Sequence, residues 1–329
     1  MRGLDPAARD PVEAASHDAA FRAPGDTPRF VIGIDGGGTQ TRLAFAAADG
    51  RELLRRTGPA GVIDPRDPAA SAATLIRLIR DAAAAAHLPL PAAALCAGLA
   101  GSGAMSLREE VRRALESAGL ARRVAVVHDG EIALAGGLGQ DPGILLAAGT
   151  GSVAYGRAED GRTGRCGGWG MLAGDEGSAF AIGRAGLQAA LRGADGRGEE
   201  TALLDDLLSS LELADIYDVP PWIGRASKGE VAAVAPAVVR LAGSGDAVAE
   251  RIVARAAAEL ALHVTTLVRR LGPWSDAVPV VFHGGLLADP QIARRVTERL
   301  AGGTVPVVRR EPAADAIAGA VRRALDLAH

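Results

Sequence analysis

Residues 30–56 read FVIGIDGGGTQTRLAFAAADGRELLRR, and this stretch decides the fold. Phe30 to Ile34 is a short β-branched run stopped by the following Asp-Gly residues, which is typical of a buried strand. Leu43 to Ala48 predicts a second strand, closed by the Asp49-Gly50 turn. The pattern therefore predicts two strands joined by a glycine-rich loop, with Asp35 at the end of the first strand.

The loop between these strands has the composition of an anion-binding turn. A Walker A loop needs Gly-Lys-Ser/Thr before a helix, and a dinucleotide fingerprint needs G-x-G-x-x-G at a helix start, so neither fits. The only lysine in the sequence, Lys228, is far along the chain from any glycine-rich loop. Backbone N–H groups and hydroxyls are therefore expected to hold a phosphate. The predicted ligands are Gly36, Gly37, Gly38, Thr39 and Thr41.

Asp35 is the predicted metal ligand. Mg²⁺ keeps much of its hydration shell and takes few protein carboxylates, so Asp35 is expected to hold it through water. The competing interpretation is an ordinary glycine-rich turn with a solvated aspartate. Residues 143–161, GILLAAGTGSVAYGRAEDG, repeat the design of strand, glycine-rich turn, strand and Asp-Gly turn. Two such loops can hold one polyphosphate from both sides.

Length and charge narrow the class of function. The chain has 329 residues, which suggests two domains, and a formal net charge of -3. Both signs of charge are spread along the sequence, so nothing indicates a nucleic-acid partner or an anionic membrane surface. No apolar run is long enough to span a bilayer. An enzyme with a small-molecule ligand is the expected class.

The cysteines and the N-terminal segment indicate the compartment. Cys96 and Cys166 form no CxxC pair and have no nearby His or Cys to complete a zinc set. This usage suits a reducing cytoplasm. Residues 1–28 are rich in Ala, Pro and Asp and lack a basic segment leading into an apolar one. A disordered tail is therefore expected there, and not a signal peptide.

A second aspartate follows a predicted strand. Val124 to His128 predicts a strand ending on Asp129, with a helix from about Glu131. In open α/β sheets ligands bind outside the carboxyl ends of strands, and both Asp35 and Asp129 lie at such ends. Aspartate is also a common helix N-cap, and the local pattern alone favours a cap at Asp129 somewhat over a ligand contact.

Residues 167–191 read GGWGMLAGDEGSAFAIGRAGLQAAL, which predicts a glycine-rich loop, an acidic pair at Asp175-Glu176 and then a helix. Asp175 can be a carboxylate placed at a helix N-terminus, where the dipole stabilises it. It can equally accept hydrogen bonds from a polyhydroxylated ligand, with Trp169 giving an apolar face. Composition leaves both interpretations open.

The rest of the C-terminal half is predominantly helical. Between residues 200 and 272 the pattern predicts helices, with His263 in the core and Lys228 as a solvated charge. Pro279 to Phe282 predicts a strand that leads into Gly284 and Gly285. Two glycines at this point either form a tight turn or let an adenine ring lie against the backbone.

These pieces occur in one order: DGGGT, the strand-end Asp129, GTGS, GGWGMLAGDEGS and FHGG. The series resembles the BadF/BadG/BcrA/BcrD ATPase family of the sugar kinase, actin and heat-shock chaperone superfamily, and most of all its N-acetylglucosamine and glucosamine kinases. The resemblance implies an α/β fold of two actin-like ATPase (ribonuclease H-like) domains of related topology, with a nucleotide cleft between them. The expected domains are residues 29–128 and 129–329, and a last helix at about 313–327 is expected to pack back on the N-terminal domain.

The resemblance also implies roles for site residues. Asp129 matches the base that acts on the sugar hydroxyl. The first phosphate loop is matched by Gly37, Gly38 and Thr39, and the second by Gly149, Thr150, Gly151 and Ser152. The adenosine segment is matched by Gly284 and Gly285, and the sugar loop by Gly168, Trp169 and Asp175.

The implied activity is transfer of the γ-phosphoryl group of Mg-ATP to the 6-OH of N-acetylglucosamine or glucosamine. The expected compartment is the cytoplasm, and a homodimer is a possible assembly. One departure leaves the sugar open. The sugar kinases carry asparagine in a G-P-x-N context, whereas this chain has Gly58-Pro59-Ala60-Gly61. N-acetylmuramic acid is an alternative acceptor.

Two alternatives come from other classes of function. Some members of the family are ATP-driven activators of 2-hydroxyacyl-CoA dehydratases or aryl-CoA reductases. For such an activator the resemblance implies a dimer in which paired cysteines bridge an iron–sulfur cluster. Cys96 and Cys166 supply the cysteine count for that role, but Cys96 lies within a predicted strand. An actin-like scaffold without an acceptor is the other alternative.

Overall fold

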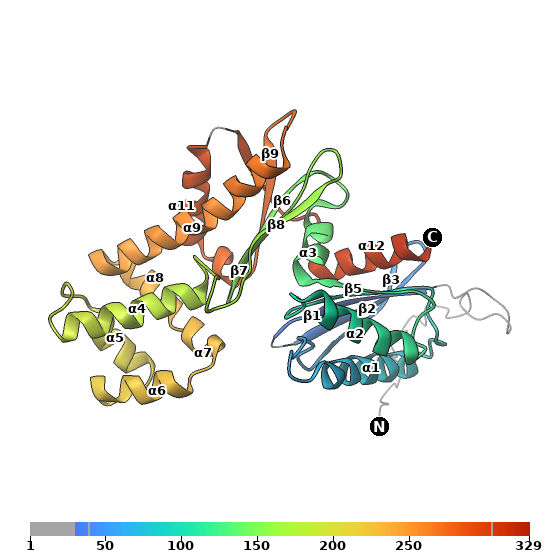
Figure 1. Cartoon of the computed structure of the whole chain (residues 1–329), viewed down its shortest axis with the longest axis horizontal. Helices are drawn as coiled ribbons and strands as arrows, with labels where there is room; N and C mark the ends of the chain where they lie inside the picture. Colours follow the sequence, from blue (N-terminus) through green and yellow to red (C-terminus); the bar gives the residue numbers. More distant parts are fainter. Residues whose placement is uncertain (1–29, 39, 304) are drawn as a thin grey trace, which may run out of the picture.

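The computed structural model describes residues 30–38, 40–303 and 305–329. The tail predicted at residues 1–28 and the predicted phosphate ligand Thr39 lie outside the described residues. The described chain forms two five-stranded sheets with helices around them (Figure 1).

The first sheet has the order β3-β2-β1-β4-β5. Its strands are β1 (Phe30–Gly36), β2 (Thr41–Ala47), β3 (Glu52–Gly58), β4 (Leu95–Leu99) and β5 (Val124–His128). Strands β1, β2 and β3 are antiparallel neighbours, whereas β4 and β5 run parallel to β1. The carboxyl ends of β1, β4 and β5 therefore meet at one edge, where Asp35 and Asp129 lie.

The second sheet repeats this plan, with the order β8-β7-β6-β9-β10 read from its antiparallel end. Its strands are β6 (Gly143–Ala148), β7 (Ser152–Arg157), β8 (Thr163–Gly167), β9 (Val278–His283) and β10 (Val307–Arg310). Again three antiparallel strands are followed by two strands parallel to the first of them. The prediction of an α/β fold built from two units of related topology is confirmed.

Helices cover both faces of the first sheet. On one face, α1 (Pro68–Ala85) and α2 (Met105–Ser117) bury Leu75, Ile79 and Leu115 against the strands. On the other face lie α3 (Asp129–Leu138) and α12 (Ala316–Ala328), between the two sheets (Figure 1). The C-terminal helix thus packs on β1, β2 and β4 of the first sheet.

Helices α3 and α12 cross closely because glycines lie at the crossing. A Cβ atom on Gly319 would lie 1.9 Å from the carbonyl oxygen of Ile132, and one on Gly136 would lie 2.1 Å from that of Asp315. The core around this crossing includes Val31 of the first sheet and Val281 of the second. One apolar cluster therefore joins the two halves of the molecule.

The remaining helices form a layer against the second sheet and beyond it. Their bounds are α4 (Ala179–Ala194), α5 (Leu203–Ser210), α6 (Val219–Arg225), α7 (Lys228–Ala232), α8 (Ala235–Gly243), α9 (Ala247–Leu271), α10 (Gly285–Ala288) and α11 (Pro290–Ala301). Helix α9 packs on β6, β7 and β8 and buries His263, as expected for a core histidine.

Within the described ranges, no single helix is both long and apolar enough to cross a membrane. The segments 228–243 and 247–271 pass that test only as a pair bent by 116°. Both contribute side chains such as Val238 and Leu260 to the core of the C-terminal half.

Candidate active site

A cavity of about 290 Å³ lies between the two sheets at the carboxyl ends of their strands. The first half of the chain contributes Asp35, Gly37, Gly38, Gln40 and Arg42, and the second contributes Asp129, Gly130, Ala133, Ala147, Val153, His283 and Ala316. The two predicted acidic residues, which are 94 positions apart in the sequence, thus line one cavity.

Asp35 lies at the end of β1, directly opposite Arg42 of β2 in the antiparallel register. The Arg42 guanidinium donates to Asp35 Oδ2 at 2.5 Å, and the aspartate side chain is 12% exposed. Arg42 was not among the predicted site residues, although its place opposite Asp35 follows from a hairpin of this length. A Mg²⁺ ion at Asp35 would compete with this guanidinium.

Asp35 fits a magnesium site of the water-rich kind. Among the described residues, no three His, Cys, Asp or Glu side chains are grouped to hold a metal ion directly. Mg²⁺ is commonly bound by one or two carboxylates, waters and substrate phosphates, and not by an all-protein cage. A carboxylate at the wall of this cavity meets that requirement.

Asp129 is the first residue of α3, and the N-cap position belongs to His128. The interpretation of Asp129 as an N-cap is therefore wrong. Its Oδ1 accepts from the N–H of Gly130 at 2.8 Å. Burial raises the pKa of Asp129 most, the Gly130 N–H opposes that rise, and the negative charge of Asp35 adds to it.

Two histidines flank these carboxylates. Burial lowers the pKa of His283, which lines the cavity at the end of β9, although the charge of Asp35 opposes the shift. Burial also lowers the pKa of His128, whose Nδ1 lies 3.0 Å from Ser102 Oγ. Both imidazoles therefore stay neutral near pH 7.

Two predicted ligands of the first loop do not reach the cavity. Thr41 is fully buried, and its hydroxyl donates to the carbonyl oxygen of Pro59 at 2.6 Å. Gly36 is packed so closely that a Cβ atom there would lie 2.6 Å from Leu99 Cδ2. The prediction of Thr41 as a phosphate ligand is therefore wrong, because its hydroxyl binds the segment that follows β3.

The same segment explains the glycine at position 61. A Cβ atom on Gly61 would lie 2.4 Å from Thr41 Oγ1. The buried threonine thus occupies the space that a side chain at this position would need.

Backbone hydrogen bonds hold the second glycine-rich turn, residues 149–152, in place. Gly149 N–H donates to the Gly151 carbonyl at 2.9 Å, and Ala179 N–H donates to the Gly149 carbonyl at 2.9 Å. Ser152 is buried, and its hydroxyl donates to the Glu176 carbonyl at 2.6 Å. The turn is therefore fixed to the segment that leads into α4.

A further cavity of about 430 Å³ adjoins this turn. It is lined by Gly149, Thr150, Ala179, Gly229, Ala232, Ala233, Ala235, Pro236, Val239, Gly285, Leu286 and Asp289. The wall from α7 and α8 was missed in the sequence, where its run of small residues reads as an ordinary helix surface. Small, apolar walls of this kind suit a flat adenine ring.

Asp175 lies in the loop before α4 but does not cap that helix. The cap is Ser178, whose hydroxyl accepts from the N–H of Ala181. Asp175 is 4% exposed and has a φ of 60°. Its Oδ2 accepts from Lys228 Nζ at 2.6 Å, so the prediction of Lys228 as a solvated charge is wrong.

The neighbouring residues of the predicted sugar loop are more open. Trp169 is 69% exposed, and the Arg165 guanidinium lies 4.6 Å from its ring centroid. Gly168 has a φ of 73°, and a Cβ atom there would lie 2.9 Å from Val153. The indole therefore presents its surface to solvent.

Comparison with known sequences agrees with this geometry. The profile of the BadF/BadG/BcrA/BcrD ATPase family matches residues 32–324. The chain belongs to this family. The match includes both glycine-rich turns, both strand-end aspartates and most of the C-terminal helix.

Relatives within this ATPase family include sugar kinases. The chain is 36% identical over 262 residues to an N-acetylmuramic acid/N-acetylglucosamine kinase of Clostridium acetobutylicum, covering 79% of this chain and 86% of that one. It is 29% identical over 268 residues to an N-acetyl-D-glucosamine kinase of Dictyostelium discoideum, covering 77% and 84%.

Solved structures show the same fold. A Chromobacterium violaceum protein, assigned only provisionally as an N-acetylglucosamine kinase, has a TM-score of 0.74 and 30% identity, with 92% of this chain and 99% of that one covered. A ROK family glucokinase from Streptomyces griseus, solved with glucose and AMPPNP, has a TM-score of 0.54 and 18% identity, with 90% and 99% covered.

The cysteines of this ATPase family member lie on different sheets. Cys96, in β4, is fully buried, and burial raises the pKa of its thiol to about 11. Cys166 lies in β8 and is partly exposed. A fully buried thiol has no access to an iron–sulfur cluster shared with a second chain, so the geometry does not favour an activator.

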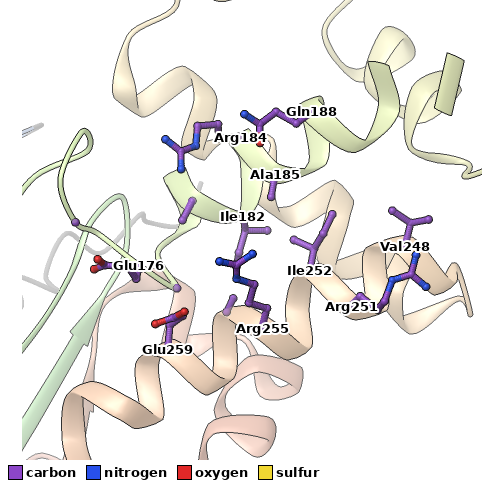
Figure 2. A pocket seen from close by; sticks show the side chains of 14 residues that line it. Glu176, Ile182, Arg184, Ala185, Gln188, Val248, Arg251, Ile252, Arg255 and Glu259 are labelled. Carbon is purple, nitrogen blue, oxygen red and sulfur yellow. The ribbon is translucent and has the colours of Figure 1, made fainter. Parts of the chain in front are cut away.

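A third cavity, of about 370 Å³, lies between α4 and α9 (Figure 2). Ile182 and Gln188 of α4 and Ile252 and Arg255 of α9 are among its walls. Neither strand-end aspartate and neither glycine-rich loop lines this cavity, so it is not part of the candidate active site.

Proposed function

We propose that this chain is a kinase that transfers the γ-phosphoryl group of Mg-ATP to a hydroxyl of an N-acetylated hexosamine, with the 6-OH as the reacting position. The observation that carries the proposal is the cavity in which Asp129 and Asp35 converge beside the first glycine-rich loop. The names of the two sugar-kinase relatives supply the acceptor class, N-acetylglucosamine or N-acetylmuramic acid.

The nucleotide is assigned to the two glycine-rich loops. The two loops are assigned to the phosphates, with the backbone N–H groups of Gly38, Thr150 and Gly151 as donors. The small-residue cavity beside Gly285 is assigned to the adenine. Asp35 would hold Mg²⁺ through water, and a bound ion would supply positive charge near the transferred phosphoryl group.

Asp129 is assigned as the base. Its carboxylate takes the proton of the acceptor hydroxyl as the oxygen forms a bond to the γ-phosphorus and the bond to the bridging oxygen of ADP breaks. The raised pKa of Asp129 makes its carboxylate a better proton acceptor than a solvated aspartate. The exposed part of the sugar loop, with Gly168 and Trp169, is assigned to the acceptor. The predicted ligand Asp175 is buried against Lys228 and is not assigned to the sugar.

The test is a panel of acceptors scored by sugar-dependent ADP release. N-acetylglucosamine and N-acetylmuramic acid are expected to stimulate release, with glucosamine and glucose as acceptors that lack the acetamido group. The position of the new phosphate is read from the product by ³¹P–¹H correlation. Nucleotide binding without any sugar-dependent ADP release would refute the kinase and leave an ATPase of another class.

A further inference from the structure

The second phosphate loop has an ion pair at its back. Lys228 Nζ lies 2.6 Å from Asp175 Oδ2, and Asp175 Oδ1 lies 3.3 Å from the N–H of Ser152. A Cβ atom on Gly151 would lie 2.8 Å from Asp175 Oδ1 and 3.2 Å from Lys228 Nζ. Both charged groups are therefore in contact range of the loop backbone.

This arrangement places a negative charge beside a loop that is assigned to phosphates. The Asp175 side chain is only 5% exposed, so water screens its charge poorly. Its Oδ1 also takes the Ser152 N–H, one of the donors at the loop. An uncompensated carboxylate at this position would oppose the binding of any polyphosphate.

Lys228 supplies the compensating charge, and it is the only lysine of the chain. Its side chain is 33% exposed and reaches Asp175 from the first residue of α7. The residue after it, Gly229, and Ala232 at the other end of α7 line the small-residue cavity. One short helix thus carries both a wall of that cavity and the charge that cancels Asp175.

We propose that Lys228 is a positioning residue that enables the second loop to accept a polyphosphate by cancelling the charge of Asp175. The proposal rests on the proposed function, because it takes ATP as the polyphosphate. Lys228 acts through Asp175 and does not itself touch the nucleotide.

The experiment measures the affinities of adenosine, ADP and a non-hydrolysable ATP analogue by calorimetry, without sugar. Lys228→Met is expected to lower the affinity for the ATP analogue by about tenfold or more and the affinity for ADP by less. The affinity for adenosine should not change, because the repulsion from Asp175 grows with the charge of the ligand. The double variant Lys228→Met with Asp175→Asn is expected to return within about threefold of the wild type, because it removes both charges together.

Two further variants keep the test decisive. Asp175→Asn alone leaves the lysine unpaired, and it is expected to bind ADP at least as tightly as the wild type does. Arg225→Gln removes an exposed positive charge from α6 that has no contact with Asp175, and it is expected to change nothing.

Three outcomes would overturn the inference. Unchanged nucleotide affinities in Lys228→Met would make the pair an ordinary surface contact. A double variant as weak as Lys228→Met would show that the lysine touches phosphate directly. Weaker ADP binding in Asp175→Asn would mean that the carboxylate supports the loop instead of opposing the ligand. A wild-type protein that binds no nucleotide would refute the proposed function and not this inference alone.

Discussion

At the scale of single residues, Asp129 combines a position at the start of α3 with a raised pKa. We expect Asp129→Asn to lower kcat by about 10²–10⁴-fold, because asparagine cannot accept the acceptor proton. Asparagine still accepts the Gly130 N–H, so the affinity for an ATP analogue should stay near that of the wild type. Steady-state kinetics and calorimetry on the same preparation check both statements.

The matched control is Asp141→Asn, an exposed carboxylate just beyond the other end of α3. It should leave kcat and nucleotide affinity unchanged. If Asp129→Asn turned over as fast as this control, Asp129 would not be the base.

The raised pKa of Asp129 also predicts how stability depends on pH. A carboxyl group with a higher pKa in the folded state binds its proton more tightly there, so stability falls as pH rises from the unfolded-state pKa, about 3.9, through the folded one. Asp129→Asn removes this loss. The melting temperature of Asp129→Asn minus that of the wild type should therefore be larger at pH 7 than at pH 4.

Each unit by which folding raises the pKa of a carboxyl group costs about 1.4 kcal/mol of unfolding free energy once the group is ionised in both states. Taking the difference between variant and wild type cancels the titration of carboxylates that do not interact with Asp129. A difference that stays constant, or that grows as the pH falls, would contradict the assigned direction.

At the scale of elements, the crossing of α3 and α12 depends on the absence of side chains. Gly319→Ala would place a Cβ atom 1.9 Å from the Ile132 carbonyl oxygen, so the helices must separate. We expect the free energy of unfolding to fall by about 1–3 kcal/mol or more, as for other overpacked cores. Urea denaturation followed by circular dichroism measures this change.

Gly224→Ala in α6 is the control for helix propensity, because a Cβ atom there would meet nothing within 4 Å. Alanine favours a helix over glycine, so this variant should gain up to about 1 kcal/mol. Equal behaviour of Gly319→Ala and Gly224→Ala would mean that the two helices do not cross as described.

At the scale of the whole molecule, one apolar cluster links the two sheets through α3 and α12. We therefore expect the halves to unfold together. The three tryptophans, Trp169, Trp222 and Trp274, all lie in the C-terminal half, whereas circular dichroism reports on both halves. Denaturation curves from tryptophan fluorescence and from circular dichroism should have the same midpoint.

Gly319→Ala provides the contrast, because it weakens the link. Both curves should shift to lower urea, and any separation between their midpoints should be larger in this variant than in the wild type. Separate midpoints in the wild type itself would show that the cluster does not couple the halves.

The sequence by itself determined the local elements and their chemistry. Short β-branched runs such as residues 30–34 predicted strands, and the glycines after Asp35 predicted a turn. These conformational preferences depend on neighbours in the chain, so the sequence contains them. The strand-end positions of Asp35 and Asp129 were readable for the same reason. The resemblance to the ATPase family also implied two halves of related topology, which the two sheets confirm.

Only the tertiary structure decided which of these groups meet. Lys228 looked solvated because 53 residues separate it from Asp175, yet folding brings the two charges to 2.6 Å. Thr41 has the residue type of a phosphate ligand, but its hydroxyl donates to Pro59, which follows the residue paired with Thr41 in the β2–β3 register. Contacts between residues distant in the chain arise from packing, which no local propensity encodes, so the partners of these polar groups could not be predicted.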